Sequence, residues 1–284
     1  MTAPVIALPA SRRPDARRRK LRWASTDVLV LTKRSLARIA REPETLMDVT
    51  VQPVIFVLLF AYVFGSAIVL PGGGNYHEYL IGGMLGMGLA QTAPSTAVAM
   101  VSDMSTGLID RFRSLPMSRA AVLAGRSIAD LLTQVIGVLV TAGVGLAIGW
   151  RIHTGVLDAL AAFGLALLFG YAFTWAGACL GMVLRSPEAA QQAGFILFLP
   201  LTFVSSAFVP TQAMPGWLQP VADWNPMSAL AAATRHYFGN PNPAATIQAW
   251  PMQHAVLTVV GWSVLMLAVF APLAVHLYRR RARA

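Results

Sequence analysis

The chain has 284 residues, of which 56% are hydrophobic and only 12% are charged. A soluble domain carries about 25% charged residues, so this composition excludes an ordinary water-soluble globule and indicates a chain embedded in a lipid bilayer. The net charge of +10 would also suit a nucleic-acid partner. However, the basic residues cluster at both chain ends and beside hydrophobic segments, which favours membrane lipid over nucleic acid as the partner.

The N-terminal region is basic and contains no apolar stretch that ends in a cleavage site. We therefore predict a disordered cytoplasmic tail over residues 1–25 rather than a signal peptide. Residues 26–42 are predicted to form a helix with one apolar face and one basic face, and a helix of this kind lies in the membrane interface. The alternative is a charged helix in solvent. The basic face consists of Arg34, Arg38 and Arg41.

Residues 43–284 form the predicted transmembrane domain, with six hydrophobic segments that are each long enough to cross ~30 Å of hydrocarbon. These segments are residues 49–69, 79–101, 128–150, 157–184, 193–209 and 256–278. If the N-terminus is cytoplasmic, all but two of the 22 Lys and Arg residues lie on the cytoplasmic side, the exceptions being Arg151 and Arg235. This asymmetry predicts a multi-pass protein of the cell membrane with both termini in the cytoplasm.

The external segment between the fifth and sixth spans, residues 210–253, is too long to be a simple connection. Its three tryptophans suit the level of the bilayer interface, and it contains the stretch Ser228–Phe238. We interpret the segment as a re-entrant element of one or two short helices. The predicted fold is therefore an all-α integral membrane protein with six transmembrane helices and this additional element. The tryptophans are Trp217, Trp224 and Trp250.

The first cytoplasmic loop, residues 102–126, is also long. Within it Leu108, Phe112 and Leu115 have the spacing of one helix face, and Pro116 ends the helix. An apolar ridge of this kind docks into a groove of a partner or rests on lipid headgroups. The residues alone leave these two interpretations open.

Several segments in the same order resemble the type-2 ABC exporter permeases, and most of all the daunorubicin-resistance permease subfamily of actinobacteria. They are Gln52–Gly65, Gly107–Pro116, Leu123–Asp130, Met214–Gln219 and Asn225–Ser228. The likeness runs from about Thr26 to the C-terminus. In that family the first cytoplasmic loop is the coupling helix, which docks into a cleft of the ATPase subunit. The resemblance implies this role for Gly107, Leu108, Asp110, Arg111, Phe112, Arg113, Leu115 and Pro116, and a smaller contact for Arg185 and Glu188.

The sequence contains no Gly-x-x-x-x-Gly-Lys-Ser/Thr loop for phosphate binding. We therefore expect no cofactor on this chain and no enzymatic activity of its own. The resemblance implies a separate ABC ATPase subunit that uses ATP and Mg, and a second permease copy, most simply as a homodimer. The implied function is export of a hydrophobic or amphipathic small molecule, such as a drug or antibiotic.

Polar residues inside the predicted spans could line a substrate path or bond neighbouring helices, and both interpretations remain open. These residues are Gln91, Thr92, Ser95, Gln134, Thr174 and Trp175. Asp130 lies one turn after Arg126, a spacing that predicts a structural ion pair near the cytoplasmic boundary. Three Gly-x-x-x-Gly pairs would allow close helix packing. They are Gly82/Gly86, Gly145/Gly149 and Gly177/Gly181.

Other classes of function fit the sequence less well. Its five histidines are scattered, with no pairing that suits a metal, and its one cysteine, Cys179, lies in a hydrophobic span. Export of a lipid or glycan is the nearest alternative, because this fold serves those substrates too. An ion-coupled secondary transporter would be expected to show repeated halves and ionisable residues at the membrane midplane. A membrane-embedded enzyme would need a catalytic set, which the sequence does not supply.

Overall fold

The computed structural model describes residues 43–105 and 119–281, and all regular secondary structure within these ranges is helical. The predicted tail, the predicted interface helix and the predicted coupling helix at residues 107–116 lie outside the described residues. The long helices are α2 (Pro43–Leu59), α3 (Tyr76–Ala90), α4 (Thr92–Ser105), α6 (Arg119–Ala147), α7 (Val156–Val183), α8 (Pro187–Phe203) and α12 (Ala255–Arg281). A π-helical turn, η1 (Phe60–Phe64), extends α2.

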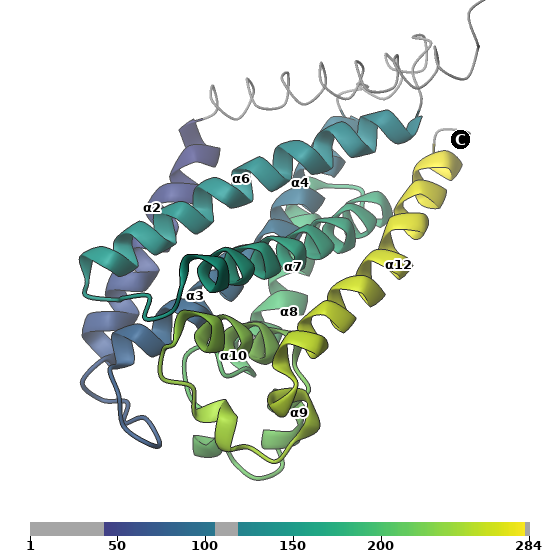
Figure 1. Ribbon diagram of the computed structural model, residues 1–284. Coiled ribbons are helices and arrows are strands. Elements are labelled where there is room, and N and C mark those ends of the chain that lie inside the picture. Colours follow the sequence, from purple (N-terminus) through teal and green to yellow (C-terminus); the bar gives the residue numbers. More distant parts are fainter. Residues whose placement is uncertain (1–42, 106–118, 282–284) are drawn as a thin grey trace, which may run out of the picture.

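Helix α7 lies at the centre of the bundle, where it packs against α3, α4, α6, α10 (Pro226–Phe238) and α12 (Figure 1). Helix α2 packs mainly on α6, and α8 packs mainly on α4, so these two helices lie at the periphery. The end of α4, the beginning of α6 and the end of α12 lie at one end of the bundle in Figure 1, whereas α9 (Gln219–Asp223) lies at the opposite end. We call this opposite end the outer end.

Three described helical segments are long and apolar enough to cross a membrane, namely Ser127–Ala147, Val156–Val183 and Ala255–Tyr278. They correspond to the third, fourth and sixth predicted spans. Val49–Phe64 is a shorter apolar helix, and α8 has 17 residues. The structure therefore supports a helical membrane protein, while the count of six crossings stays a prediction.

The second predicted span, residues 79–101, is two helices rather than one, because the chain is interrupted at Gln91 between α3 and α4. Pro94 lies in the first turn of α4, where its missing N–H group is tolerated, whereas inside a continuous helix it would remove a hydrogen bond. The hydroxyl of Thr92 donates to the Leu89 carbonyl at 2.6 Å. The break therefore follows from local sequence, and α3 and α4 together form one interrupted rod.

Glycines bring α7 into close contact with α4. A Cβ atom added at Gly177 would overlap the carbonyl oxygen of Ala93, and one added at Gly181 would lie 2.5 Å from the carbonyl oxygen of Ala97. The prediction that this glycine pair packs helices is confirmed. Of the pair Gly145/Gly149, only the first lies in a helix, since Gly149 has φ +104° in the turn after α6.

The region after α8 is built from short helices, of which α10 is the longest. Asn225 caps its N-terminus by accepting the Met227 N–H at 2.8 Å, and Gly239 ends it with φ +68°. Almost all of α10 is buried against α3, α7 and α12. The remaining short elements are η2 (Thr211–Ala213), α9, η3 (Pro243–Thr246) and α11 (Trp250–Gln253). Short helices are thus present in the segment where one or two were expected, and α10 covers Ser228–Phe238 together with the two residues before it.

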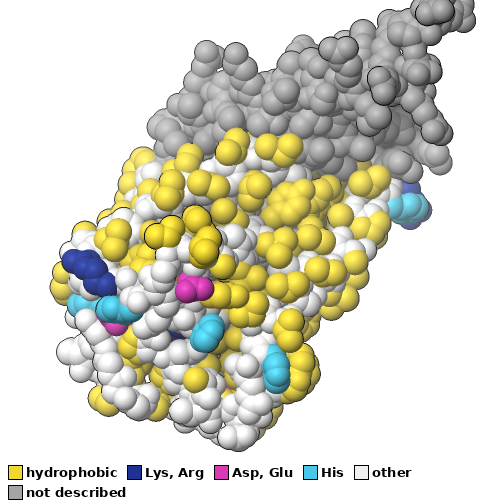
Figure 2. Space-filling view, viewed as in Figure 1, with side chains coloured by type: hydrophobic (Ala, Val, Ile, Leu, Met, Phe, Trp, Pro, Cys, Tyr) yellow, Lys and Arg dark blue, Asp and Glu magenta, His cyan; other side chains and the backbone are white. Residues whose placement is uncertain are grey.

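The surface has the pattern of a chain in contact with hydrocarbon. On the face shown in Figure 2, hydrophobic side chains cover the middle of the bundle, while most charged side chains and histidines gather near the outer end. The exposed apolar side chains come from several helices, which include α2, α6, α8 and α12. In water this exposed area would promote aggregation, so its natural environment is lipid or another protein.

Candidate functional site

Two of the predicted polar residues meet in the core of the bundle. The Nε2 atom of Gln134 on α6 donates to the hydroxyl of Thr174 on α7 at 2.8 Å, and both side chains are buried. Gly170 lies beside this contact, since a Cβ atom there would lie 2.6 Å from Gln134 Oε1. The arrangement ties α6 to α7, which favours helix packing over the path interpretation for these two residues.

Asp130 has a partner that its sequence spacing did not indicate. The hydroxyl of Thr96 on α4 donates to Oδ2 of Asp130 on α6 at 3.2 Å. The side chain of Arg126, its predicted ion-pair partner, lies outside the described residues. The carboxylate therefore links α6 to α4, whereas the pair with Arg126 stays a prediction.

The polar residues at the break between α3 and α4 lie on one side of the rod. Ser95 is exposed, and Gln91 and Thr92 are half-buried. The hydroxyl of Ser95 donates to the Gln91 carbonyl at 3.1 Å. The hydroxyls of Thr92 and Ser95 therefore satisfy backbone carbonyls at the break.

Trp175 does not join the other predicted path residues. Its ring contacts Tyr171 edge-on at 6.3 Å between centroids, and it packs beside a buried cluster that includes Met100 and Met182. Its indole N–H is buried and has no hydrogen-bond partner among the described residues. The structure thus joins Gln134 to Thr174 by a hydrogen bond, whereas the hydroxyls of Thr92 and Ser95 bond backbone carbonyls of their own rod.

The turn between α7 and α8 carries the predicted second cytoplasmic contact. Arg185 and Glu188 are both exposed there, on either side of Ser186, whose hydroxyl accepts the Ala189 N–H at 3.2 Å and so begins α8. Met182, just before the turn, packs with Tyr278 of α12 and with Met100 of α4. The turn therefore lies at the same end of the bundle as the last residues of α4 and α12. The two predicted cytoplasmic contacts must lie at one end if they are to bind the same partner.

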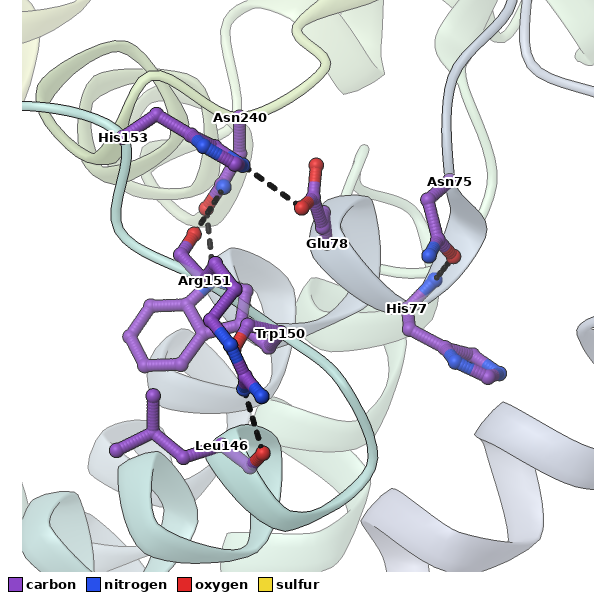
Figure 3. A network of polar contacts seen from close by, with 8 residues as sticks. All are labelled: Asn75, His77, Glu78, Leu146, Trp150, Arg151, His153 and Asn240. Carbon is purple, nitrogen blue, oxygen red and sulfur yellow. Dashed lines mark hydrogen bonds and ion pairs between the residues drawn. The ribbon is translucent and has the colours of Figure 1, made fainter.

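The outer end is held by a polar network that the sequence did not reveal (Figure 3). The indole of Trp150 donates to Asn240 Oδ1 at 2.7 Å, and Asn240 Nδ2 donates to the Arg151 carbonyl at 2.8 Å. His153 lies 2.8 Å from Glu78 of α3. The loop between α6 and α7 is thereby joined both to the residues after α10 and to the start of α3.

A fully buried arginine lies beside this network. Arg235 of α10 donates from Nε to the Tyr79 carbonyl at 2.8 Å, and from Nη2 to the carbonyls of Ser206 and Ala207 at 2.9 and 3.0 Å. Its guanidinium carbon lies 3.5 Å from the centre of the Tyr79 ring. Among the described residues its partners are thus carbonyl oxygens and an aromatic ring, and its Nη1 atom is buried with no hydrogen-bond partner there. The only sequence signal was its position as one of two basic residues predicted to be external.

Asn225 and Ser228 of α10 hold the same backbone segment. Asn225 Nδ2 donates to the carbonyls of Leu201, at 2.7 Å, and Val204, while the hydroxyl of Ser228 accepts the Ser206 N–H at 2.8 Å. Residues 204–208 have no helical structure and would otherwise bury several unpaired backbone groups. One edge of α10 therefore supplies the hydrogen bonds that the chain loses where α8 ends.

The residues in and around the short helix α9 form an exposed apolar ridge. Trp217, Val221 and Trp224 follow helical spacing and are more than half exposed, whereas Asp223 is buried. Burial raises the pKa of the Asp223 carboxyl, and a hydrogen bond with Thr211 opposes that shift. An exposed tryptophan ridge agrees with the predicted position at a bilayer interface.

Long apolar helices, an apolar surface and buried polar contacts between helices define an α-helical membrane protein. The model of the ABC-2 type transporter family matches residues 26–238, well over half of the chain. The chain therefore belongs to the ABC-2 type transporter family.

Curated relatives agree with this assignment. The chain is 33% identical over 239 residues to the daunorubicin resistance ABC transporter permease protein DrrB1 of Streptomyces coeruleorubidus, covering 84% of this chain and 81% of the relative. It is 27% identical over 266 residues to the probable doxorubicin resistance ABC transporter permease protein DrrC of Mycobacterium tuberculosis, covering 91% and 94%. It is also 26% identical over 222 residues to the putative transport permease ycf38 of Pyropia yezoensis, covering 76% and 75%.

Proposed function

We propose that this chain is the transmembrane permease subunit of an ATP-driven ABC exporter that moves a hydrophobic or amphipathic drug-like molecule out of the cell. The observation that carries the proposal is the family match together with relatives named for resistance to daunorubicin and doxorubicin over most of both chains. Those compounds are named for the relatives. For this chain they define the class of molecule to test first.

The proposed topology has six crossings in the cell membrane with both termini in the cytoplasm. Helices α2 with η1, α3 with α4, α6, α7, α8 and α12 would make the crossings, and α9 to α11 would form the external re-entrant element. The concentration of basic residues in the predicted cytoplasmic segments supports this orientation. The exposed tryptophans near the outer end support an external interface position.

The proposed motor is a separate ABC ATPase subunit, which would bind ATP and Mg. It would dock on Gly107–Pro116 and, through a smaller contact, on Arg185 and Glu188. Arg185 and Glu188 are exposed, and they lie at the same end of the bundle as the last residues of α4. This position is compatible with such docking. A complete exporter would contain two permease copies, most simply a homodimer, because the ATPase domains of ABC transporters work in pairs.

The test uses inside-out vesicles that contain the permease and its co-purified ATPase, with doxorubicin as a fluorescent probe. We expect ATP-dependent uptake, and we expect no uptake when the P-loop lysine of the ATPase is replaced by alanine. Uptake that continues in that variant but stops when an ionophore collapses the ion gradients would instead identify a secondary transporter. Transport of a lipid-linked glycan, with no uptake of doxorubicin, would identify the lipid or glycan alternative.

A further inference from the structure

The outer end of α3 and the backbone just after α8 are joined by direct contacts. The Tyr79 hydroxyl donates to the Ser206 carbonyl at 2.6 Å, and the Tyr76 hydroxyl donates to the Phe208 carbonyl at 3.2 Å. At Gly83 a Cβ atom would overlap the Ala207 carbonyl oxygen, so only glycine allows this approach. The first two turns of α3 therefore lie directly against residues 206–208.

Arg235 completes this junction from a third element. One guanidinium group binds Tyr79 of α3 through its carbonyl and its ring, and binds residues 206 and 207 through their carbonyls. A planar fork with five N–H donors can satisfy several carbonyls at fixed angles, whereas a lysine ammonium cannot reproduce that geometry. Because the group is fully buried, water cannot replace any contact that is lost.

The position of the junction matters because α3 and α4 form one rod. The rod begins at Tyr76 near the outer end and ends at Ser105 at the opposite end of the bundle (Figure 1). Helix α8 packs along α4 and reaches the junction at its own last turn. A displacement of the α3–α4 rod therefore also displaces the end of α8, as long as the contacts of the junction are kept.

We propose that Arg235 is a positioning residue that makes the start of α3, residues 201–208 and α10 a single rigid unit, so that displacement of the α3–α4 rod moves the outer end of α8. This inference rests on the proposed function, because it concerns how work done at the motor end reaches the outer end. It assigns to Arg235 neither contact with the drug nor contact with the ATPase.

The first experiment compares Arg235→Lys with Arg151→Lys. Arg151 is a matched control, because it also donates to backbone carbonyls at the outer end, but those of Leu146 and Trp150 lie within five residues of it along the chain. We expect Arg235→Lys to retain ATPase binding and hydrolysis while doxorubicin uptake per ATP falls by roughly tenfold, within the range that residues of a coupling network produce. The Arg151→Lys variant should transport normally. Equal uptake per ATP in Arg235→Lys and wild type overturns the proposal.

If Arg235→Lys does not fold, Tyr79→Phe carries the test. This variant keeps the ring under the guanidinium and removes the hydroxyl contact with Ser206. We expect a smaller loss of uptake per ATP at an unchanged rate of hydrolysis. Unchanged uptake per ATP in a stable Tyr79→Phe protein overturns the proposal, because the junction would then not transmit the movement.

A second measurement does not depend on transport. In a Cys179→Ser background, a cysteine replaces Ser205, which is buried within the junction. We expect a membrane-impermeant maleimide to label Ser205→Cys slowly in the complete transporter and much faster when Arg235→Lys or Tyr79→Phe is added. If wild type takes up no probe, the proposed function fails, while the labelling rates still decide on the junction. Equal labelling rates of Ser205→Cys with and without these substitutions overturn the proposal.

Discussion

Gln134 of α6 and Thr174 of α7 form a direct side-chain hydrogen bond of 2.8 Å in the interior of the bundle. Gly170 lies against the amide group, so that the two helices approach closely at this level. Polar contacts of this kind stabilise helix pairs in membranes, where no water competes for the donors. The bond accounts for the amide N–H of Gln134, while its Oε1 atom is buried with no hydrogen-bond partner among the described residues.

A double-mutant cycle measures this contact. We expect Gln134→Leu and Thr174→Val each to lower the melting temperature of the detergent-purified protein, with a coupling energy of about 0.6 kcal/mol, the average for such bonds in membranes. Ser95→Ala is the control, because its hydroxyl donates to the Gln91 carbonyl one turn earlier in the same rod and not to another helix. A changed drug range with unchanged stability would instead favour the path interpretation.

Glycine contacts between α4 and α7 give a stronger prediction. Gly177→Ala places a methyl group on the Ala93 carbonyl, so the helices must separate, at a cost of about 1–3 kcal/mol. Gly164→Ala in the same helix is the matched control, because no heavy atom lies within 4 Å of the added group. Thermal unfolding of both variants should show a lower melting temperature only for Gly177→Ala. Equal melting temperatures would contradict the close packing of α4 on α7.

Asp130 is predicted to act in folding rather than in drug selection. Asp130→Asn removes the charge that accepts the Thr96 hydroxyl, and bonds to charged groups contribute about 1.5–3 kcal/mol. We expect the yield of folded protein to fall while the relative uptake of different drugs stays the same. Thr96→Val should also lower the yield of folded protein, but by a smaller amount. A selective change in drug range at normal yield would reject this role.

The predicted coupling helix is tested through its partner. Phe112→Ala and Arg113→Glu should weaken ATPase binding by about tenfold or more, as expected for anchor residues at an interface, or separate hydrolysis from transport. Co-purification and ATPase assays measure both effects. Arg151→Glu at the outer end is the control for a charge change and should leave binding intact. Normal coupled hydrolysis in both loop variants would remove the coupling assignment.

Hydrophobicity predicted the helical membrane fold without any coordinates. Apolar length predicts the helices that could cross a bilayer, and three of the six predicted spans correspond to such helices among the described residues. The glycine pair Gly177/Gly181 was likewise visible as a packing motif. Family membership was also accessible from linked motifs in order.

Only the tertiary structure decided which polar residues meet. Gln134 and Thr174 are 40 positions apart, and Arg235 and Tyr79 are 156 apart, so neither pairing follows from helical periodicity. Sequence also gave no reason to expect that the carbonyls left free where α8 ends would be satisfied by one edge of α10. That arrangement arises because buried backbone groups must find donors, and the fold places Asn225, Ser228 and Arg235 within reach.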